Sequence, residues 1–254
     1  MAAIGISFSE FDHRPIRIND LWCMHPHIQN IINLERMYVL HADKVRYGKL
    51  ALHLRKLCLH RFKEEKPPSH AYIVEYNEVM NLIDPNSRLA FLDISTRSAF
   101  IGRLYIRLSP NSEAAIQFML LSLAELKHTY ADTSLLHMWM HNKDREYIQF
   151  GDYELNTGQG GPGIVPGLAN AGVYNKPWRA GTVWGFLNKS SVAGQFFILT
   201  RDIPREVLTA AAYGMVEDGF PALEKLARYC DGGCDITDIF IKDCGMVLNT
   251  SLFQ

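Results

Sequence analysis

The most informative candidate site residues of this chain are a glutamine and a phenylalanine two positions apart, Gln195 and Phe197. They belong to a short apolar run, residues 194–200, and alternate side chains of an extended strand point to opposite faces. Gln195 and Phe197 therefore share one face, while Phe196 and Ile198 share the other. A glutamine beside an aromatic ring is typical of a shallow apolar pocket with one hydrogen-bonding group at its wall.

Other groupings of chemically capable residues are less complete. His137 and His141 are four residues apart, but no third His or Cys and no intervening Glu accompanies them. Cys230 and Cys234 flank a Gly-Gly turn and lack a second pair of ligands. The glycine-rich residues 158–163 lack the Gly-Lys-Ser/Thr ending of a phosphate-binding loop, which favours a surface loop. We therefore expect no metal site and no cofactor.

Composition narrows the class of protein. The chain has 254 residues, a net charge of −1 and 48% hydrophobic residues, which is ordinary for a globular protein and gives no global field for nucleic acid or membrane. No apolar run is long enough to span a bilayer, and the first residues lack the pattern of a signal peptide. The five scattered cysteines fit a reducing, cytoplasmic compartment better than a disulfide framework.

Several segments, in a fixed order, resemble those of cyclophilins, the peptidyl-prolyl cis-trans isomerases. Residues 195–200 are similar to the Gln-Phe-Phe-Ile-x-Thr strand of that family, and residues 212–216 to its Phe/Tyr-Gly-x-Val strand. Five further segments resemble the opening strand, the Gly-Arg strand, the first helix, the Gln-Gly-Gly-Asp-Phe turn and the closing strand: residues 89–94, 101–108, 110–126, 149–153 and 239–245. The resemblance covers residues 85–254.

The resemblance implies a mainly β fold, a closed antiparallel β-barrel capped by two helices. We expect these helices near residues 110–127 and 219–230, where apolar residues recur at helical spacing. We also expect Phe118, Phe196 and Ile198 to be buried in the core.

Prolyl isomerisation needs an apolar pocket for the proline ring and a donor that stabilises the twisted amide, with neither a nucleophile nor a metal. In cyclophilins an arginine supplies that donor. Counting back from Gln149 puts His141 at its position, a second register puts His137 there, and the nearest arginine is Arg145. The resemblance implies that Gln149, Gln195 and Phe197 are retained as vestigial substrate-binding residues, but it yields no secure catalytic residue.

The other pocket positions of the family are changed. Glu146 and Tyr147 stand where cyclophilins have a Phe-Met pair. The family's Trp, Leu and His positions fall, without gaps, on Arg205, Glu206 and Ala210. Two charges in a dry apolar pocket cost roughly several kcal/mol unless they are paired or solvated. The sequence therefore predicts that these pocket functions are lost.

The peptide-binding Ala-Asn-Ala segment of the family has two candidate counterparts. Ala169-Asn170-Ala171-Gly172 matches it by residue type. An ungapped count back from Gln195 instead reaches Gly185-Phe186-Leu187. We favour the second register, because the first lies too far before Gln195.

Residues 1–84 form an N-terminal extension outside the resemblance. Within it, residues 43–63 have apolar residues at helical spacing and a basic face, and we expect an amphipathic helix capped by Asp43. The basic face is either simply solvated or docks to an acidic partner protein. In the second case we expect the binding residues to be Arg55, Lys56 and Arg61.

We interpret the sequence as a divergent cyclophilin-like protein that lacks isomerase activity and serves as a structural or protein-interaction subunit of a larger assembly. Two alternatives stay open: a slow isomerase using His141 or Arg145, and a proline-peptide binder without turnover. The layout of an extension before a degenerate domain resembles that of cyclophilin-like proteins of ciliary axonemes and radial spokes. Partners would be proteins, in the cytoplasm or on the cytoskeleton, and neither nucleic acid nor membrane.

Overall fold

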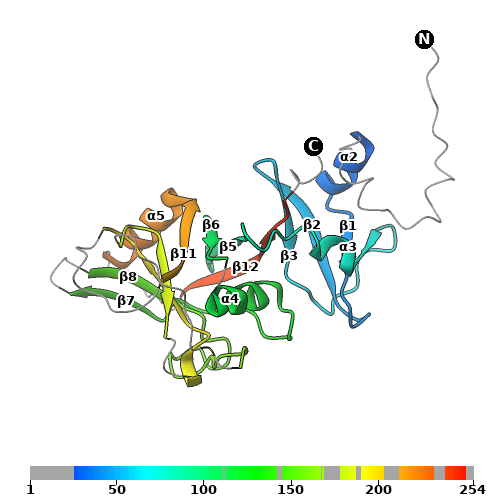
Figure 1. Cartoon of the computed structure of the whole chain (residues 1–254). Coiled ribbons are helices and arrows are strands. Elements are labelled where there is room, and N and C mark those ends of the chain that lie inside the picture. The colour runs from blue at the N-terminus through cyan, green and yellow to red at the C-terminus, as the bar shows by residue number, and fades with distance from the viewer. Residues whose placement is uncertain are drawn as a thin grey trace, which may run out of the picture. The chain divides into compact units, whose positions relative to one another are not determined.

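The computed structural model describes residues 26–110, 112–141, 145–166, 168, 178–186, 190–202, 212–231 and 238–249, with the backbone alone at 26–28, 138–141, 145, 146, 230 and 231. The chain divides into two compact units (Figure 1). Unit 1 comprises residues 1–83 and 248–254, and unit 2 comprises residues 84–247. The last residues of the chain thus belong with its first part.

Unit 1 contains a four-stranded sheet with the order β4-β1-β2-β3. Neighbouring strands are antiparallel except for β1 and β4, which are parallel. Its elements are α2 (Pro26–Asn33), β1 (Met37–Leu40), β2 (Tyr47–His53), β3 (Lys56–His60), β4 (Tyr72–Glu75) and α3 (Tyr76–Met80). Met37, Val39, Leu50 and Val74 are fully buried on one face of this sheet. The alternation of buried and half-buried residues along β1 is that of a strand with one covered face.

The predicted helix over residues 43–63 is wrong, because β2 and β3 occupy this stretch. The apolar residues at 50, 54 and 57 fit a helical stripe, but the chain turns back at Leu54 and Arg55, and Leu54 is 68% exposed. Leu50 and Leu57 are buried by strand pairing instead. Pairing of the two strands of a hairpin has overridden a pattern that fitted either element.

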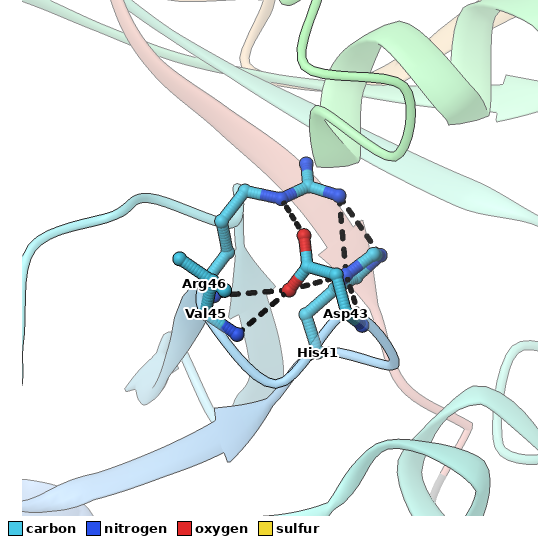
Figure 2. A network of polar contacts seen from close by, with 4 residues as sticks. All are labelled: His41, Asp43, Val45 and Arg46. Atoms are coloured by element: carbon cyan, nitrogen blue, oxygen red, sulfur yellow. Dashed lines mark hydrogen bonds and ion pairs between the residues drawn. The ribbon is translucent and has the colours of Figure 1, made fainter.

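Asp43 caps a turn between β1 and β2 rather than a helix (Figure 2). Its Oδ1 accepts hydrogen bonds from the backbone N–H groups of Val45 (3.0 Å) and Arg46 (3.1 Å), and its Oδ2 accepts one from Arg46 Nε (2.5 Å). The guanidinium of Arg46 also lies 3.1 Å from His41 Nδ1, and the side chain of Arg46 is 6% exposed. The edge of the His41 ring packs against Phe62. The turn is therefore organised around a buried cation.

Burial raises the pKa of Asp43, but the hydrogen bonds from Arg46, Val45 and His41 outweigh it and hold the pKa well below its usual range. The carboxylate is thus charged at every ordinary pH and compensates the Arg46 guanidinium. Removing this carboxylate would leave the buried Arg46 guanidinium without its compensating charge.

We therefore expect Asp43→Asn to lower the free energy of unfolding of unit 1 by about 1–2 kcal/mol, because Arg46 is buried whereas the Asp43 side chain is 30% exposed. Hydrogen exchange of the β1 and β2 amides, followed by mass spectrometry at neutral pH, measures this effect locally. Glu65→Gln is the control, because Glu65 is an exposed carboxylate in the same unit. Equal exchange rates in the two variants would contradict the role given to Asp43.

Unit 2 contains a sheet with the strand order β12-β5-β6-β11-β9-β10-β8-β7 and two α-helices. The strands are β5 (Leu89–Thr96), β6 (Phe100–Leu108), β7 (His137–His141), β8 (Arg145–Phe150), β9 (Thr182–Gly185), β10 (Phe196–Leu199), β11 (Ala212–Asp218) and β12 (Ile239–Val247). The helices are α4 (Glu113–Leu123) and α5 (Phe220–Asp231), with a short 3-10 turn, η2, at Ser190–Val192. The predicted strands and both predicted helices of this unit are confirmed.

Helix α4 packs on β12 and β5, and helix α5 packs on β6. Phe118, Phe196 and Ile198 are fully buried, as predicted. The α4 residue Phe118 packs its ring against Phe196 of β10 (centroids 5.0 Å apart) and against Tyr130 (4.8 Å). One face of β10 thus contributes to the core beneath α4.

No continuous strand ladder joins β7 to β12 at the two ends of this sheet in the described residues. The segment just before β7 does pair with β12. Ser134 and Phe240 form an antiparallel bridge, and the N–H groups of Asp132 and Leu135 donate to the carbonyls of Ile241 and Ile239, each over 2.7 Å. Unit 2 is thus mainly β, with one large sheet and few helices.

Candidate functional site

Strand β10 carries Phe197 and follows directly on Gln195, and it lies between two antiparallel partners. Phe197 is opposite Gln149 on β8 and opposite Trp184 on β9. The two predicted faces of this strand are real: Phe196 packs toward Phe118, whereas Phe197 packs in a separate group of side chains. Strand pairing therefore brings together Gln149, Gln195 and Phe197.

Phe197 belongs to an aromatic cluster, which we define as Tyr147, Trp178, Trp184, Phe186 and Phe197. Trp184 stacks on Phe197, with ring centroids 5.0 Å apart and an interplanar angle of 22°. The edges of Phe186 (4.8 Å) and Tyr147 (5.3 Å) meet the same residue nearly at right angles. Trp178 packs edge-on against Trp184 at 5.5 Å. These offset and edge-to-face arrangements are the favourable ones for aromatic pairs.

The cluster covers Phe197 almost completely. Phe197 is only 4% exposed, and Trp184 and Trp178 are 6% and 7% exposed. Phe186 is the outer member, with 39% of its surface exposed. The ring that would form the wall of a proline pocket is therefore occupied by side chains of this same chain.

The two glutamines hydrogen-bond to each other and to a loop. Gln149 Nε2 donates to Gln195 Oε1 over 2.6 Å, and Gln195 Nε2 donates to the carbonyl of Gly160 over 2.7 Å. Gln195 is fully buried. Its amide therefore holds the loop at Gly160 in place, whereas the sequence predicted a hydrogen-bonding group at the wall of a pocket.

The glycine-rich loop that begins near residue 154 is organised by one buried carboxylate, Asp152. Its Oδ1 accepts from the N–H of Leu155 (2.9 Å), and its Oδ2 accepts from Gly158 (2.8 Å), Thr157 (3.0 Å) and Gly160 (3.1 Å). The loop does gather amide donors around an anion, as a phosphate cradle would, but the anion is its own side chain. The sequence signal was an aspartate followed closely by several glycines.

Burial raises the pKa of Asp152, but the hydrogen bonds from Leu155, Gly160, Thr157 and Gly158 outweigh it and lower the pKa below its ordinary value. The sign of the pH dependence follows. A carboxyl group with a lowered folded-state pKa gives its full stabilisation above the unfolded-state pKa of about 3.9. This stabilisation is lost as the pH falls through the folded-state pKa.

We expect Asp152→Ala to lower the free energy of unfolding by about 3 kcal/mol at neutral pH, because one buried N–H group, that of Gly160, and three part-buried ones lose their acceptor. The difference from the unaltered protein should shrink as the pH falls below about 4. Guanidinium unfolding curves at stepped pH values measure both effects. The exposed neighbour Glu154, changed to Ala, should shift stability by no more than about 0.5 kcal/mol. A pH-independent loss in Asp152→Ala would contradict the carboxylate's role.

The remaining predicted site residues lie at the edge of, or outside, the described structure. The strand register pairs His141 with Arg145 across the β7–β8 hairpin, and only the backbone of these two residues is described. His137 is an exposed residue at the start of β7, opposite Gln149. The replaced pocket positions lie outside the described residues: Arg205, Glu206 and Ala210.

The end of strand β9 includes Gly185, the first residue of one of the two candidate counterparts of the Ala-Asn-Ala segment. Gly185 is opposite Phe196 on β10, and Phe186 follows and contacts Phe197. The residues at the end of β9 thus lie at the aromatic cluster. The alternative, residues 169–172, lies outside the described structure, as does Leu187.

The three residues predicted to bind a partner lie on unit 1 and do not form one patch. Arg55 is at the tip of the β2–β3 hairpin, and Lys56 is the first residue of β3. Arg61 follows the far end of β3, and six residues of extended chain separate it from Arg55 by about 20 Å. The predicted helix would have put these three residues closer together. Because that helix is absent from residues 43–63, the three residues do not form the single surface that the prediction assumed.

No group of three or more His, Cys, Asp or Glu side chains within the described part of the chain could hold a metal ion. Among the helices that the structure describes, none is long and apolar enough to cross a membrane.

Comparisons with known proteins agree with this architecture. No protein-family model and no curated protein sequence matches the chain. Among solved structures, the chain is similar to the crystal structure of the Mimivirus cyclophilin, with 21% identity and a TM-score of 0.50. The match covers 66% of this chain and 93% of that cyclophilin. Likeness at this identity speaks for fold rather than for activity, and it shows that the chain has a cyclophilin-like fold.

Proposed function

We propose that this protein is a catalytically degenerate cyclophilin-like protein that acts as a structural or protein-interaction subunit of a larger assembly. The observation that carries the proposal is the covering of Phe197. A prolyl isomerase must admit a proline ring to an apolar surface before it can stabilise the twisted amide. Here Trp184 stacks on the Phe197 ring and Phe186 and Tyr147 meet it edge-on, so that 4% of this residue is exposed.

Two further observations support the loss of activity. The hydrogen-bonding capacity of Gln195 is directed at Gln149 and Gly160 rather than outward. In the sequence, the positions that correspond to the family's Trp, Leu and His carry Arg205, Glu206 and Ala210. Each change removes a contact that a bound proline would need, and together they favour a retained scaffold without turnover.

We also propose that the sheet of unit 2 closes into a barrel. The hydrogen bonds from Asp132 and Leu135 to β12, and the bridge between Ser134 and Phe240, support closure through the segment that leads into β7.

We expect the protein not to accelerate X-Pro isomerisation. The uncatalysed reaction takes tens to hundreds of seconds. NMR exchange on a proline-containing peptide measures this with the intact chain. Saturable acceleration that disappears in Phe197→Ala would instead favour the alternative of a slow isomerase. The layout shared with axonemal cyclophilin-like proteins makes the ciliary axoneme the first assembly in which to look for the protein.

A second candidate function, proline-peptide binding without turnover, rests on Phe186, whose ring is 39% exposed beside Phe197. On the main proposal, in which Phe186 covers the Phe197 ring, we instead expect Phe186→Ala to uncover that ring and to strengthen binding of an X-Pro peptide by about tenfold, about 1.4 kcal/mol. Titration of the peptide, followed by tryptophan fluorescence, measures the affinity.

Phe100→Ala is the matched control for that experiment, because Phe100 is an exposed phenylalanine elsewhere on unit 2, with 56% of its surface exposed. It should leave peptide affinity unchanged. Weaker binding in Phe186→Ala would mean that Phe186 itself is the peptide contact, which would favour the second candidate function over a blocked site.

A further inference from the structure

The β2–β3 hairpin of unit 1 ends in an unusual turn. His53 and Lys56 form its last strand pair, so only Leu54 and Arg55 connect the two strands. Both connecting residues have positive φ angles, 48° and 63°. Such two-residue turns favour Asn-Gly, because a side chain with a Cβ is unfavourable in the left-handed region. This hairpin therefore keeps two poorly suited residues at its tip.

The strands below the tip hold this turn in place. The register runs without a shift from Leu50 opposite Leu59 to His53 opposite Lys56, and Leu50, Leu59 and Cys58 are fully buried. Asn-Gly would form the same turn with less strain. Since folding does not require leucine and arginine here, the strained turn is evidence for a role outside folding.

The tip presents an apolar side chain in a basic setting. Leu54 is 68% exposed, more than any other large apolar side chain that the structure describes, and Arg55 is exposed beside it. Residues 44–63 contain seven Lys and Arg and no Asp or Glu. Some of these cations are paired within unit 1, such as Lys49 with Glu35 and Lys44 with Glu75. The hairpin still carries a positive excess.

We propose that the tip of the β2–β3 hairpin is a docking site for an acidic protein segment that carries apolar side chains. Leu54 packs against an apolar side chain of the segment, while Arg55 attracts its carboxylates. The proposal rests on the proposed function as an interaction subunit and names the surface and the chemistry of the partner.

The tip fits a protein better than the two other anionic partners. Stable membrane attachment requires more apolar insertion than one leucine provides. Single-stranded nucleic acid is bound through aromatic side chains on which bases stack, and the tip residues 53–56 include no Phe, Tyr or Trp.

The experiment uses the full chain and a fluorescein-labelled peptide of alternating glutamate and phenylalanine, with fluorescence anisotropy as the readout. We expect saturable binding that weakens with added salt. Leu54→Ser and Arg55→Glu should each weaken it by at least about tenfold. The matched controls are Leu34→Ser and Lys66→Glu, which change another exposed leucine (55% exposed) and another exposed cation of unit 1. Leu34→Ser should leave affinity within about twofold, and Lys66→Glu should cost less than Arg55→Glu.

A double variant, Leu54→Asn with Arg55→Gly, separates docking from folding. It should raise the melting temperature by roughly 2–4 °C, because the turn loses its strain, and abolish peptide binding. If the tip had only a structural role, the double variant would be more stable and peptide binding would be unchanged.

The proposal is overturned if the peptide does not bind, if the double variant binds it as well as the unaltered chain, or if the controls weaken binding as much as the tip variants do. Stronger tip-dependent binding to phosphatidylserine vesicles or to single-stranded DNA than to the peptide would also overturn it. Failure here is distinct from failure of the proposed function, because isomerase activity is assayed on a proline peptide and does not involve the tip.

Discussion

Strand β10 is buried on both faces, and much of unit 2 depends on how each face is covered. On one side Phe196 meets Phe118 and Tyr130 beneath α4, which is the core expected of this architecture. On the other side the cover is aromatic, with Trp184 from the neighbouring strand stacked on Phe197. Because side chains of the same chain cover this second face, its apolar surface stabilises the fold and is not available to bind a ligand. Trp184 and Phe197 therefore stabilise the fold by packing together, and this packing keeps a ligand from reaching Phe197.

The polar groups beside β10 also bind partners within the chain itself. Gln195 and Asp152 are fully buried, and each accepts or donates hydrogen bonds that fix the loop between residues 154 and 160. Buried polar groups are costly unless their partners are provided, so such a loop cannot change shape without exposing unmatched groups. The hydrogen bonds of Asp152 and Gln195 thus restrain this loop.

The sequence predicted unit 2 well because its elements are specified locally. The resemblance to cyclophilin segments marks residues 89–94 and 101–108 as strands, and helical spacing after Ser112 and near Pro221 marks the two helices. The aromatic cluster could not be predicted in this way. Trp178, Trp184 and Phe197 meet only through strand pairing, and the register of β9 was one of two alternatives. The stretch 43–63 failed for a related reason, since its leucines fit helical spacing and strand pairing equally well. Asp43 was nevertheless identified as a capping residue, because its chemistry is the same at a turn as at a helix.

The end of the chain has a consequence for how unit 1 forms. Leu248 donates its N–H to the carbonyl of Leu57 (2.8 Å), and Asn249 donates to Leu82 (2.9 Å). Unit 2 is therefore inserted within the sequence of unit 1. During synthesis the ribosome delivers residues 26–83 first, then the whole of unit 2, and only afterwards the two residues that complete these hydrogen bonds. In the order of synthesis, unit 1 is therefore begun first and completed last. A fragment cut at residue 84 would lack these final bonds however long it was given to fold.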